Sequence, residues 1–389
     1  MHRGGTSLAA GTKRDRAVRL WNPVTGDPIN GALTGHGDTV TGIATVAASE
    51  DRALLATTSD DHTLRLWDVG AGARPREHES HSDEVTNVCV VSLPTGRTLL
   101  ATTSRDNTIR LWDAGTGRLV GAPLTGHSSP VTDAAAVALR DGRVLLATSS
   151  WDETVRLWDP NTCEQVGKPL KGHKDSVTTV ATVRVRNGRT LLATGSWDKT
   201  VRLWDPEIGR RVGPPLRGHT QWVNGITTVP LPDGRILLAT AGDDQMTLLW
   251  DPITRRRTGA PLRGHHNAVE AVTALALPDG RTVLATTGAD ETVRLWDPAT
   301  SKQVGRTLKG HTGTVQAVVD VPRPGGRALL ATTSDDRTVR LWDIATYACV
   351  RVFPLTDAGV GLAVVGSTLA VATKGGLLAL DLDVLLNSD

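Results

Sequence analysis

The chain of 389 residues is long enough for one to three domains of average size, although a single all-β domain can also reach this length. Its 43 Lys and Arg residues nearly balance 41 Asp and Glu residues, which excludes an overall electrostatic attraction to nucleic acid or an anionic membrane. An apolar fraction of 39% is sufficient for a packed core, and no low-complexity tract indicates disorder. A charged partner must therefore be recognised by a local patch.

Tryptophan stands out in the composition, with 11 residues against a single tyrosine and a single phenylalanine. The three cysteines, Cys89, Cys163 and Cys349, are far apart and form no metal-binding or disulfide motif. We therefore predict a protein without metal or cofactor in a reducing compartment. The first residues lack the apolar core of a signal peptide, and no segment reaches the roughly 18 apolar residues of a membrane span. These features predict a cytoplasmic protein without membrane attachment.

Eight of the tryptophans recur at an interval of 45 or 46 residues, each followed by Asp, or by Asn in the first copy. They are Trp21, Trp67, Trp112, Trp158, Trp204, Trp250, Trp296 and Trp342. A histidine lies at a constant position between consecutive copies, and glycine precedes it everywhere except at His81. These histidines are His36, His81, His127, His173, His219, His265 and His311. A repeat of this length indicates an array of small structural units.

One repeat, taken in chain order, predicts four short strands. Residues 211–216 form the first strand, residues 222–229 the second and residues 235–240 the third, and the last strand ends at Trp250. The turn pair Asp233-Gly234 tolerates the positive φ of a tight hairpin. Each unit leaves no room for a helix, and its uncharged apolar runs predict a sheet that is covered on both faces.

This pattern of Gly-His and Trp-Asp pairs at a constant period resembles the WD-repeat β-propeller family. The Arg-rich, Lys-poor composition and the nearly identical repeats are similar to those of bacterial, actinobacterial-type members of that family. The resemblance implies an all-β propeller of four-stranded antiparallel blades around a channel. It also implies that the turns entering each innermost strand and the turns between the second and third strands share one face, the top face. The remaining turns then share the bottom face.

The number of blades is open between two alternatives. Eight sets of strands fit between residues 28 and 382, which favours eight blades, whereas the alternative is seven blades plus leftover strands. We expect residues 1–27 to form a partial blade that closes the ring beside the C-terminal strands, because an open sheet edge invites aggregation. Residues 383–389 are expected to form a tail.

Histidine, serine and aspartate recur together with the repeat tryptophan. The clearest copies are His173, Ser196, Asp198 and Trp204, and His311, Ser334, Asp336 and Trp342. A catalytic triad is one interpretation. Repetition in blade after blade instead favours a structural ladder, and the family resemblance implies hydrogen bonds from Asp to His, to Ser and to the indole N–H. Gly242 and Gly288 replace the serine in blades 5 and 6, so we expect incomplete or weakened ladders there.

Three tryptophans, Trp151, Trp197 and Trp222, lie outside the Trp-Asp series. The other repeats hold mostly polar, charged or small residues at the same positions, which predicts exposure to solvent. All three positions belong to top-face turns of consecutive blades, so we expect one aromatic patch of the kind that anchors binding interfaces. We predict that this patch binds a partner, with Arg105 and Asn224 at its polar rim. The alternative is that each indole lies flat over a neighbouring blade as packing.

Charged turn residues give a second, weaker pattern. Arginine follows the first turn of most units, and Arg255, Arg256 and Arg257 lie in another bottom turn. The top turns carry more carboxylates, among them Asp60, Glu84, Asp243 and Glu270. A basic bottom face is suited to nucleic acid or another anion.

The sequence as a whole predicts a non-enzymatic scaffold that holds a protein or peptide on the top face and acts as a monomer. Binding of nucleic acid or an anion to the bottom face is the alternative function, and hydrolysis by one modified blade is a third. No catalytic residue is predicted, because no acid, base or metal cluster stands outside the repeat.

Overall fold

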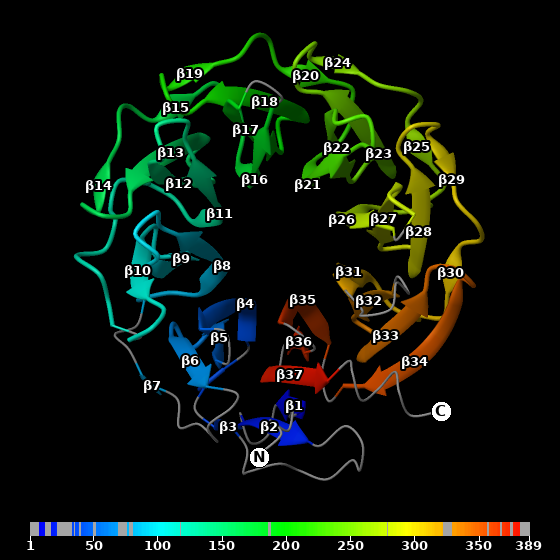
Figure 1. Ribbon diagram of the computed structural model, residues 1–389, viewed down its shortest axis with the longest axis horizontal. Coiled ribbons are helices and arrows are strands. Elements are labelled where there is room, and N and C mark those ends of the chain that lie inside the picture. Colours follow the sequence, from blue (N-terminus) through cyan, green and yellow to red (C-terminus); the bar gives the residue numbers. More distant parts are fainter. Residues whose placement is uncertain are drawn as a thin grey trace.

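The strands of the described chain form eight antiparallel sheets that follow one another around a ring (Figure 1). The computed structural model describes residues 8–11, 17–21, 33–34, 36–38, 40–49, 52–68, 76–77, 81–116, 118–185, 188–277, 279–321, 329–355, 358–365, 368–373 and 376–381. No helix occurs within these ranges. The prediction of an all-β ring of antiparallel sheets is confirmed.

Seven sheets are numbered here in chain order. Sheet 1 holds β4 (Val40–Ser49), β5 (Arg52–Ser59), β6 (Leu64–Asp68) and β7 (Arg76–Glu77). Sheet 2 holds β8 (Val85–Ser92), β9 (Thr98–Ser104) and β10 (Ile109–Asp113). Sheet 3 holds β11 (Val131–Ala138), β12 (Val144–Ser150), β13 (Thr154–Asp159), β14 (Glu164–Gln165) and β15 (Leu170–Lys171). Sheet 4 holds β16 (Val177–Arg184), β17 (Thr190–Ser196), β18 (Thr200–Asp205), β19 (Arg210–Arg211) and β20 (Leu216–Arg217).

The numbering continues around the ring. Sheet 5 holds β21 (Val223–Pro230), β22 (Ile236–Gly242), β23 (Met246–Asp251), β24 (Arg256–Arg257) and β25 (Leu262–Arg263). Sheet 6 holds β26 (Val269–Ala276), β27 (Thr282–Gly288), β28 (Thr292–Asp297), β29 (Lys302–Gln303) and β30 (Leu308–Lys309). Sheet 7 holds β31 (Val315–Val321), β32 (Leu329–Ser334), β33 (Thr338–Asp343) and β34 (Ala348–Pro354).

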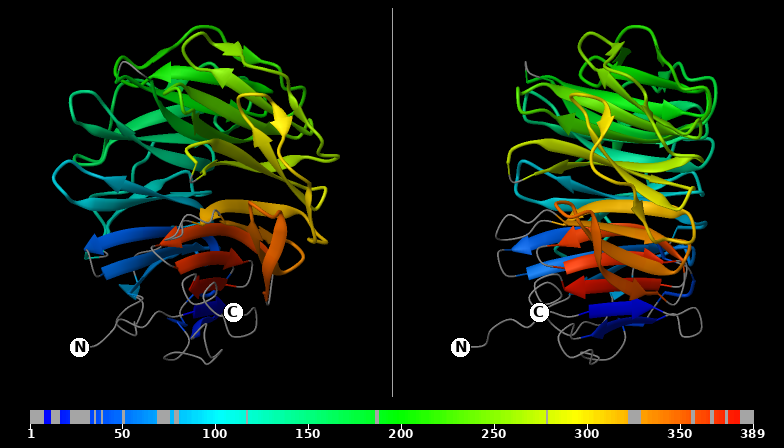
Figure 2. Two further views of the ribbon diagram at one scale, coloured as in Figure 1. Left: turned by 45° about the vertical axis from the view of Figure 1, so that its right-hand side comes forward. Right: turned by 90° about the vertical axis from the view of Figure 1, so that its right-hand side faces the viewer.

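The eighth sheet combines both ends of the described chain. It holds β35 (Gly359–Val365), β36 (Thr368–Thr373), β37 (Gly376–Asp381), β1 (Leu8–Gly11), β2 (Ala17–Trp21) and β3 (Leu33–Thr34). β1 pairs with β37 through Ala9 and Ala379, and Figure 2 shows β1 and β2 (dark blue) beside the red C-terminal strands. β35 lies between β31 and β4 at the centre of the ring (Figure 1). We call this the composite sheet, and the division into residues 1–27, 28–382 and 383–389 stays a prediction.

The outermost strand is the element that the sequence predicted least well. Residues 211–216 were expected to form one strand. In the structure they belong to the outer edge of sheet 4, which consists of two separate segments, β19 and β20. Gly213, Pro214 and Pro215 lie between them, and proline cannot donate to a strand ladder. Sheets 3, 5 and 6 have the same interrupted edge, whereas β34 of sheet 7 is continuous.

The hydrophobic core lies between neighbouring sheets. In one cluster, Val201 and Leu203 of sheet 4 pack with Leu238, Leu248 and Trp250 of sheet 5. Between sheets 3 and 4, Trp204 of sheet 4 packs in the same way among residues of sheet 3. The repeat tryptophan therefore joins its own sheet to the preceding one, which explains why the strands are apolar on both faces.

A buried threonine, and not the predicted serine, is the centre of each ladder. In sheet 4, Nε2 of His173 lies 2.8 Å from Oγ1 of Thr194, and the Trp204 indole N–H donates to the same hydroxyl at 2.9 Å. Nδ1 of His173 lies 3.0 Å from Oδ2 of Asp198. Ser196 instead donates to the Asp175 carbonyl at 3.1 Å and accepts the backbone N–H of Asp198 at 2.9 Å. It therefore holds the turn and takes no part in the bond to tryptophan.

The second predicted ladder, in sheet 7, repeats this correction. His311 contacts Asp336 at 2.8 Å and Thr332 at 2.9 Å, and Trp342 donates to Thr332 at 2.8 Å. Ser334 donates to the Gly313 carbonyl at 2.9 Å. The two hydroxyl positions lie on the same face of the strand. Trp342 pairs with Leu330, so the threonine, two residues farther along the strand, is nearer to the tryptophan than the serine, four residues farther along.

The bonds from aspartate through histidine and threonine to tryptophan are present in sheets 5 and 6, so the expectation that Gly242 and Gly288 interrupt them was wrong. In sheet 5, Met246 replaces the threonine whose hydroxyl donates to the aspartate in sheet 4, so that bond is missing. His219 contacts Asp244 and Thr240 at 3.0 and 2.8 Å, and Trp250 donates to Thr240 at 2.9 Å. The same bonds occur in sheet 6 around Thr286. Glycine removes only the serine bond to the turn. In the first pair of strands, residues 8–21, Lys13 stands at the serine position and was expected to weaken the ladder, but it lies outside the described residues.

The ladder fixes the charge of its carboxylate. Burial alone would raise the pKa of Asp198, but hydrogen bonds from His173, Thr200 and the Lys174 backbone N–H lower it well below the usual range. Burial lowers the pKa of His173 despite its bond to Asp198. A buried network in which every group has a partner holds the strands in one register.

Each innermost strand of sheets 1–7 carries a β-bulge just after its first valine. A bulge redirects one side chain out of the regular alternation. In sheets 2, 3 and 4 this side chain is a threonine that donates to the first valine carbonyl of the next sheet. The bonds are Thr86 to Val131 at 2.5 Å, Thr132 to Val177 at 2.7 Å and Thr178 to Val223 at 2.7 Å. The bulges therefore link consecutive sheets.

We predict that Thr194→Val destabilises the protein by about 1–3 kcal/mol, because it leaves the buried His173 and Trp204 nitrogens without their shared partner. Thr194→Ser retains the hydroxyl and is the matched control. Urea unfolding followed by circular dichroism measures both. Equal stability of Thr194→Val and the wild type would contradict a central role of the threonine.

Candidate functional site

The top face of this ring brings together the turns that enter each sheet and the turns between the second and third strands. Backbone hydrogen bonds join the two kinds of turn within a sheet. Trp151 N–H donates to the Pro130 carbonyl, and Trp197 N–H donates to the Ser176 carbonyl, both at 3.0 Å. In sheet 5, Asp243 N–H donates to the Trp222 carbonyl, also at 3.0 Å. Residues at these paired positions are held side by side.

The three tryptophans outside the ladders form one continuous stack on this face. Trp197 and Trp222 are stacked, with ring centroids 4.6 Å apart and planes inclined by 20°. Trp151 contacts Trp197 in a tilted arrangement, with ring centroids 5.7 Å apart and planes inclined by 38°. The structure therefore brings together the three residues that the sequence placed in one patch. We call Trp151, Trp197 and Trp222 the indole stack.

The stack joins three consecutive sheets and remains open to solvent at both ends. Trp151 follows β12, Trp197 follows β17 and Trp222 precedes β21. Trp151 is 40% exposed and Trp222 is 43% exposed, whereas Trp197 between them is half-buried. Such an exposed apolar group is unusual on a protein surface and is typical of a binding site.

Gly242 leaves room for the turn that carries Trp222. A Cβ atom at this position would lie 2.7 Å from the Trp222 carbonyl oxygen and 2.8 Å from Nδ1 of His219. Serine occupies the equivalent position in sheets 3 and 4. Glycine in place of serine at position 242 therefore gives the Trp222 carbonyl its space, and the bonds from His219 to Thr240 and Asp244 remain.

The two polar residues predicted at the rim of the stack are both engaged within the protein. Arg105, in sheet 2, forms an ion pair with Glu84, with Nε 2.8 Å from Oε2. Asn224 is the bulge residue of sheet 5, and its amide donates to Asp243 at 2.7 Å and to the Val269 carbonyl at 3.2 Å. Its main role in the structure is to link sheets 5 and 6.

Three carboxylates converge beyond the Trp222 end of the stack. Asp243 lies in a turn of sheet 5, Glu270 is the bulge residue of sheet 6, and Asp335 lies in a turn of sheet 7. Burial, together with the charges of Asp243 and Asp335, raises the pKa of Glu270. The sequence singled out Asp243 and Glu270 as top-face acids but missed their convergence with Asp335. We call these three residues the acid cluster.

A second group of acids lies beyond the Trp151 end, in sheets 1 and 2. Burial, together with Glu84 and Asp38, raises the pKa of Asp60 to about 6, and Arg105 opposes this shift. The indole stack therefore has carboxylates on both sides along the ring.

Beneath the stack, a buried carboxylate ties the innermost strands of sheets 2, 3 and 4 together. Asp133 accepts the Asn87 amide at 2.5 Å, the Ala134 N–H at 2.8 Å and the Val180 N–H at 3.0 Å. Burial raises the pKa of Asp133 to about 6 despite these bonds. Sheets 3 and 4, which carry Trp151 and Trp197, are held together by this side chain.

Most described arginines after the first turn of a sheet are neutralised by an acid of the same sheet. Arg143, Arg235 and Arg281 pair with the aspartate two residues earlier, at 2.6, 2.6 and 2.7 Å. Arg97 and Arg189 pair with the aspartate that follows the repeat tryptophan, Asp113 and Asp205. The bottom face is therefore less basic than the sequence predicted. Arg256 and Arg257, on the outer edge of sheet 5, are exposed.

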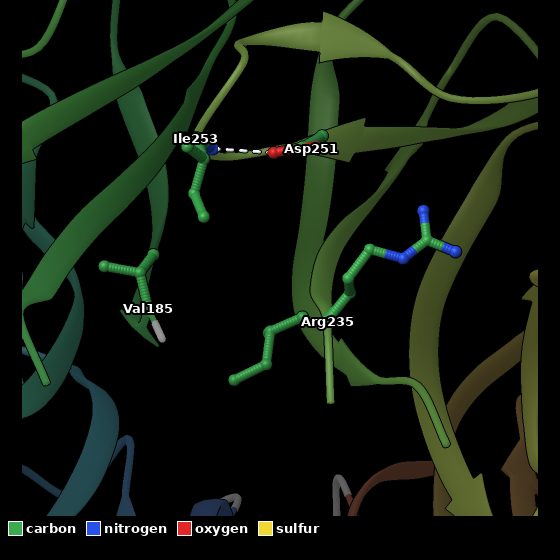
Figure 3. A pocket seen from close by; sticks show the side chains of 5 residues that line it. Val185, Arg235, Asp251 and Ile253 are labelled. Atoms are coloured by element: carbon green, nitrogen blue, oxygen red, sulfur yellow. Dashed lines mark hydrogen bonds between the residues drawn. The ribbon is translucent and has the colours of Figure 1, made fainter. Parts of the chain in front are cut away.

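Two hollows lie away from the indole stack. One of about 160 Å³ lies between sheets 4 and 5 and is lined by Val185, Arg235, Ile236, Asp251 and Ile253. Figure 3 shows the Arg235 guanidinium turned away from Val185, so the lining toward the hollow is mostly aliphatic. The other, of about 740 Å³, lies at the outer edge of sheet 4 beside Lys168, Lys171, Arg210 and Arg211. The cationic side chains of this second hollow lie on an open surface.

Comparison with protein-family models identifies the repeat. The family described as "WD domain, G-beta repeat" matches residues 28–68, 73–113, 118–159, 163–205, 211–251, 256–297 and 302–343. The chain belongs to the WD40 family. Each matched segment ends with the third strand of one of sheets 1–7, so this WD40 propeller has seven WD repeats and a composite sheet outside them. The alternative of seven blades plus leftover strands matches the seven WD repeats, and the leftover strands form the eighth sheet of the ring.

One solved structure shows the same fold. The crystal structure of the computationally designed Ika8 protein is similar to this WD40 propeller with a TM-score of 0.72 and 21% sequence identity. The match covers 90% of this chain and 98% of that chain. No curated protein matches the sequence. Comparison therefore supports the family and the fold, and names no partner.

The ladders of this WD40 propeller do not have the geometry of a catalytic triad. The ladder threonines are 0% exposed, and the hydroxyl of Thr194 is already shared between His173 and Trp204. Within the described ranges, no group of three His, Cys, Asp or Glu side chains is arranged to hold a metal ion. No helix in the described part of the chain is long and apolar enough to span a membrane.

We predict that Gly242→Ala displaces the turn that holds Trp222 and separates it from Trp197, because a Cβ atom there collides with the Trp222 carbonyl. The exciton-coupled tryptophan signal in far-ultraviolet circular dichroism then weakens. Gly225→Ala, whose Cβ would lie 3.6 Å from the nearest atom, the Glu270 carbonyl oxygen, is the control and retains the signal. An unchanged signal in Gly242→Ala would contradict this account.

We predict that Glu270→Gln stabilises the WD40 propeller by about 1 kcal/mol at neutral pH, because glutamine can donate to the next sheet and carries no charge. The pKa of Glu270 is raised in the folded state, so the wild type gains stability as pH falls toward the ordinary glutamate value of 4.5. The difference between variant and wild type therefore shrinks on acidification. Urea unfolding at neutral pH and near pH 4.5 measures this difference in stability, and Glu164→Gln on the exposed β14 is the control. A destabilised Glu270→Gln would show that the carboxylate supports the fold.

Proposed function

We propose that this WD40 propeller is a non-enzymatic scaffold that holds a protein or peptide segment on its top face, with the indole stack as the anchor. WD40 propellers generally act as protein-interaction scaffolds and are generally non-enzymatic. The observation that supports this site is the continuous stack of three indoles from three sheets, with both outer rings open to solvent. We also propose that the protein is cytoplasmic and acts as a monomer.

The stack is suited to binding because its geometry is fixed before a partner arrives. Indole rings supply a large apolar area and lose little side-chain entropy when they are covered. Mutual stacking holds Trp197 and Trp222 in place, and the backbone bonds at Trp151 and Trp197 hold their turns. A partner that covers these rings therefore gains the transfer free energy of apolar surface without first ordering the site.

The alternative functions have less support from the structure. Anion binding at the bottom face is opposed by the ion pairs that neutralise Arg143, Arg235 and Arg281. Hydrolysis is opposed by the buried ladder hydroxyls. The exposed cations beside the hollow at sheet 4 are the remaining feature in favour of an anion.

The test is a selection of displayed random dodecapeptides on the full chain, followed by fluorescence anisotropy with the enriched peptides. The variant combines Trp151→Ala, Trp197→Ala and Trp222→Ala. We expect it to weaken binding by roughly thirtyfold or more, as for removal of interface hot spots. Unfolding by urea confirms that the variant retains its fold.

The control variant combines Ile208→Ala and Ile253→Ala. These residues are 63% and 60% exposed in turns after the third strands of sheets 4 and 5, and their change removes apolar area away from the top face. Binding by this variant should match the wild type. Full affinity in the tryptophan variant, or a loss only in the isoleucine variant, would overturn the proposed site.

A further inference from the structure

The acid cluster has an unusual structural position. Glu270 occupies the bulge position at which Thr86, Thr132, Thr178 and Asn224 donate to the next sheet. A charged carboxylate has no hydrogen to donate, so sheet 6 lacks this link to sheet 7. The residue breaks a rule that the preceding sheets follow, and such local departures tend to occur at functional sites.

Glu270 is also unfavourable electrostatically in the free protein. It is half-buried, and the charges that act on it most strongly, Asp243 and Asp335, repel its own. Asp243 accepts a hydrogen bond from the neutral amide of Asn224, and Asp335 accepts one from the neutral amide of Gln316. A positive charge placed among the three would relieve this repulsion.

The surface above sheet 6 has room for such a group. The positions equivalent to Trp222 of sheet 5 and Trp197 of sheet 4 hold Ala268 and Ala289 in sheet 6. The Ala289 N–H donates to the Ala268 carbonyl at 2.9 Å, so both turns keep the usual geometry. At these two positions, between the carboxylates of sheets 5 and 7, sheet 6 carries only methyl groups.

The acid cluster is continuous with the indole stack. The Asp243 N–H donates to the carbonyl of Trp222, so the residue with the first carboxylate is bonded through its backbone to the residue with the last indole. Beyond the other end of the stack, Asp60 lies near Glu84 and Asp38, and Glu84 is ion-paired with Arg105. An extended segment lying across the stack would meet carboxylates at both ends.

From this juxtaposition we propose that the partner is a cationic polypeptide segment, with a Lys or Arg side chain over Asp243, Glu270 and Asp335 and its neighbouring side chains on the indole stack. This inference rests on the proposed function, since it names the chemistry of the partner for the same site. Carboxylates attract the cation through partly desolvated charge pairs, and the indole faces favour both apolar side chains and further cations. A nucleic acid or an acidic segment would be repelled.

The experiment analyses the peptides enriched on the full chain in the selection described above. We expect them to carry a net positive charge together with apolar or aromatic residues. Three synthetic peptides then compare one enriched sequence with versions in which every Lys and Arg is replaced by Gln or by Glu. The dissociation constants should rise in that order, and the preference should decline at high salt, because screening weakens exposed charge pairs.

The key variant is Glu270→Gln, with Glu164→Gln as the control for charge. We expect Glu270→Gln to weaken the cationic peptide by roughly tenfold and to leave the Gln version of the peptide unaffected. Glu164→Gln should change neither. Because Glu270→Gln is expected to be more stable than the wild type, a loss of affinity in it does not report unfolding.

The outcomes separate the two proposals. Enriched peptides that are neutral or acidic, or a cationic peptide whose affinity is equal for wild type and Glu270→Gln, would overturn the cationic partner while the indole stack stands as the site. Binding that survives the triple tryptophan change would overturn the proposed function and, with it, this inference.

Discussion

The shared threonine hydroxyl in the middle of each ladder is the interaction on which the rest of this WD40 propeller depends. In sheet 4 it joins His173 from one turn to Trp204 from the third strand, while Asp198 holds the same histidine from the other side. The tryptophan then packs against the preceding sheet. One buried hydroxyl thus fixes the turns, the strand register and the contact between sheets. Because the same bonds recur around the ring, the top-face turns are held at constant positions.

A constant interior allows the surface to differ from sheet to sheet. The ladder uses the threonine, histidine, aspartate and tryptophan of each repeat, and the side chains at other turn positions can vary without breaking it. The indole stack and the acid cluster both arise at such positions. Trp151 and Trp197 take places where other sheets hold charged or small residues, and Glu270 takes the place of a hydrogen-bond donor. Differences between repeats therefore locate the binding surface better than the repeated residues do.

The sequence was sufficient for the fold and for the indole stack, because the repeat supplies its own comparison for every position. It failed where two side chains compete for one role or where the ring brings distant residues together. Serine and threonine two residues apart face the same side of a strand, and only the structure shows that Thr194, the nearer of the two to the residue paired with Trp204, accepts the indole N–H. Asp243, Glu270 and Asp335 meet only because three sheets adjoin. The ion pair between Arg143 and Asp141 could have been predicted from the sequence, since both residues belong to one short turn.

The two parts of the top face differ in what they contribute to binding, and the difference follows from their physics. Burial of indole surface is largely insensitive to salt and sets most of the affinity. Charge pairs at the acid cluster are screened by salt, and they select the sign and orientation of a partner more than they raise its affinity. Repulsion around Glu270 is present before binding and disappears when a cation covers it. A cationic segment is therefore favoured twice, by the charge it meets and by the strain that it removes, whereas a neutral segment with the same apolar residues gains only the contact with the indoles.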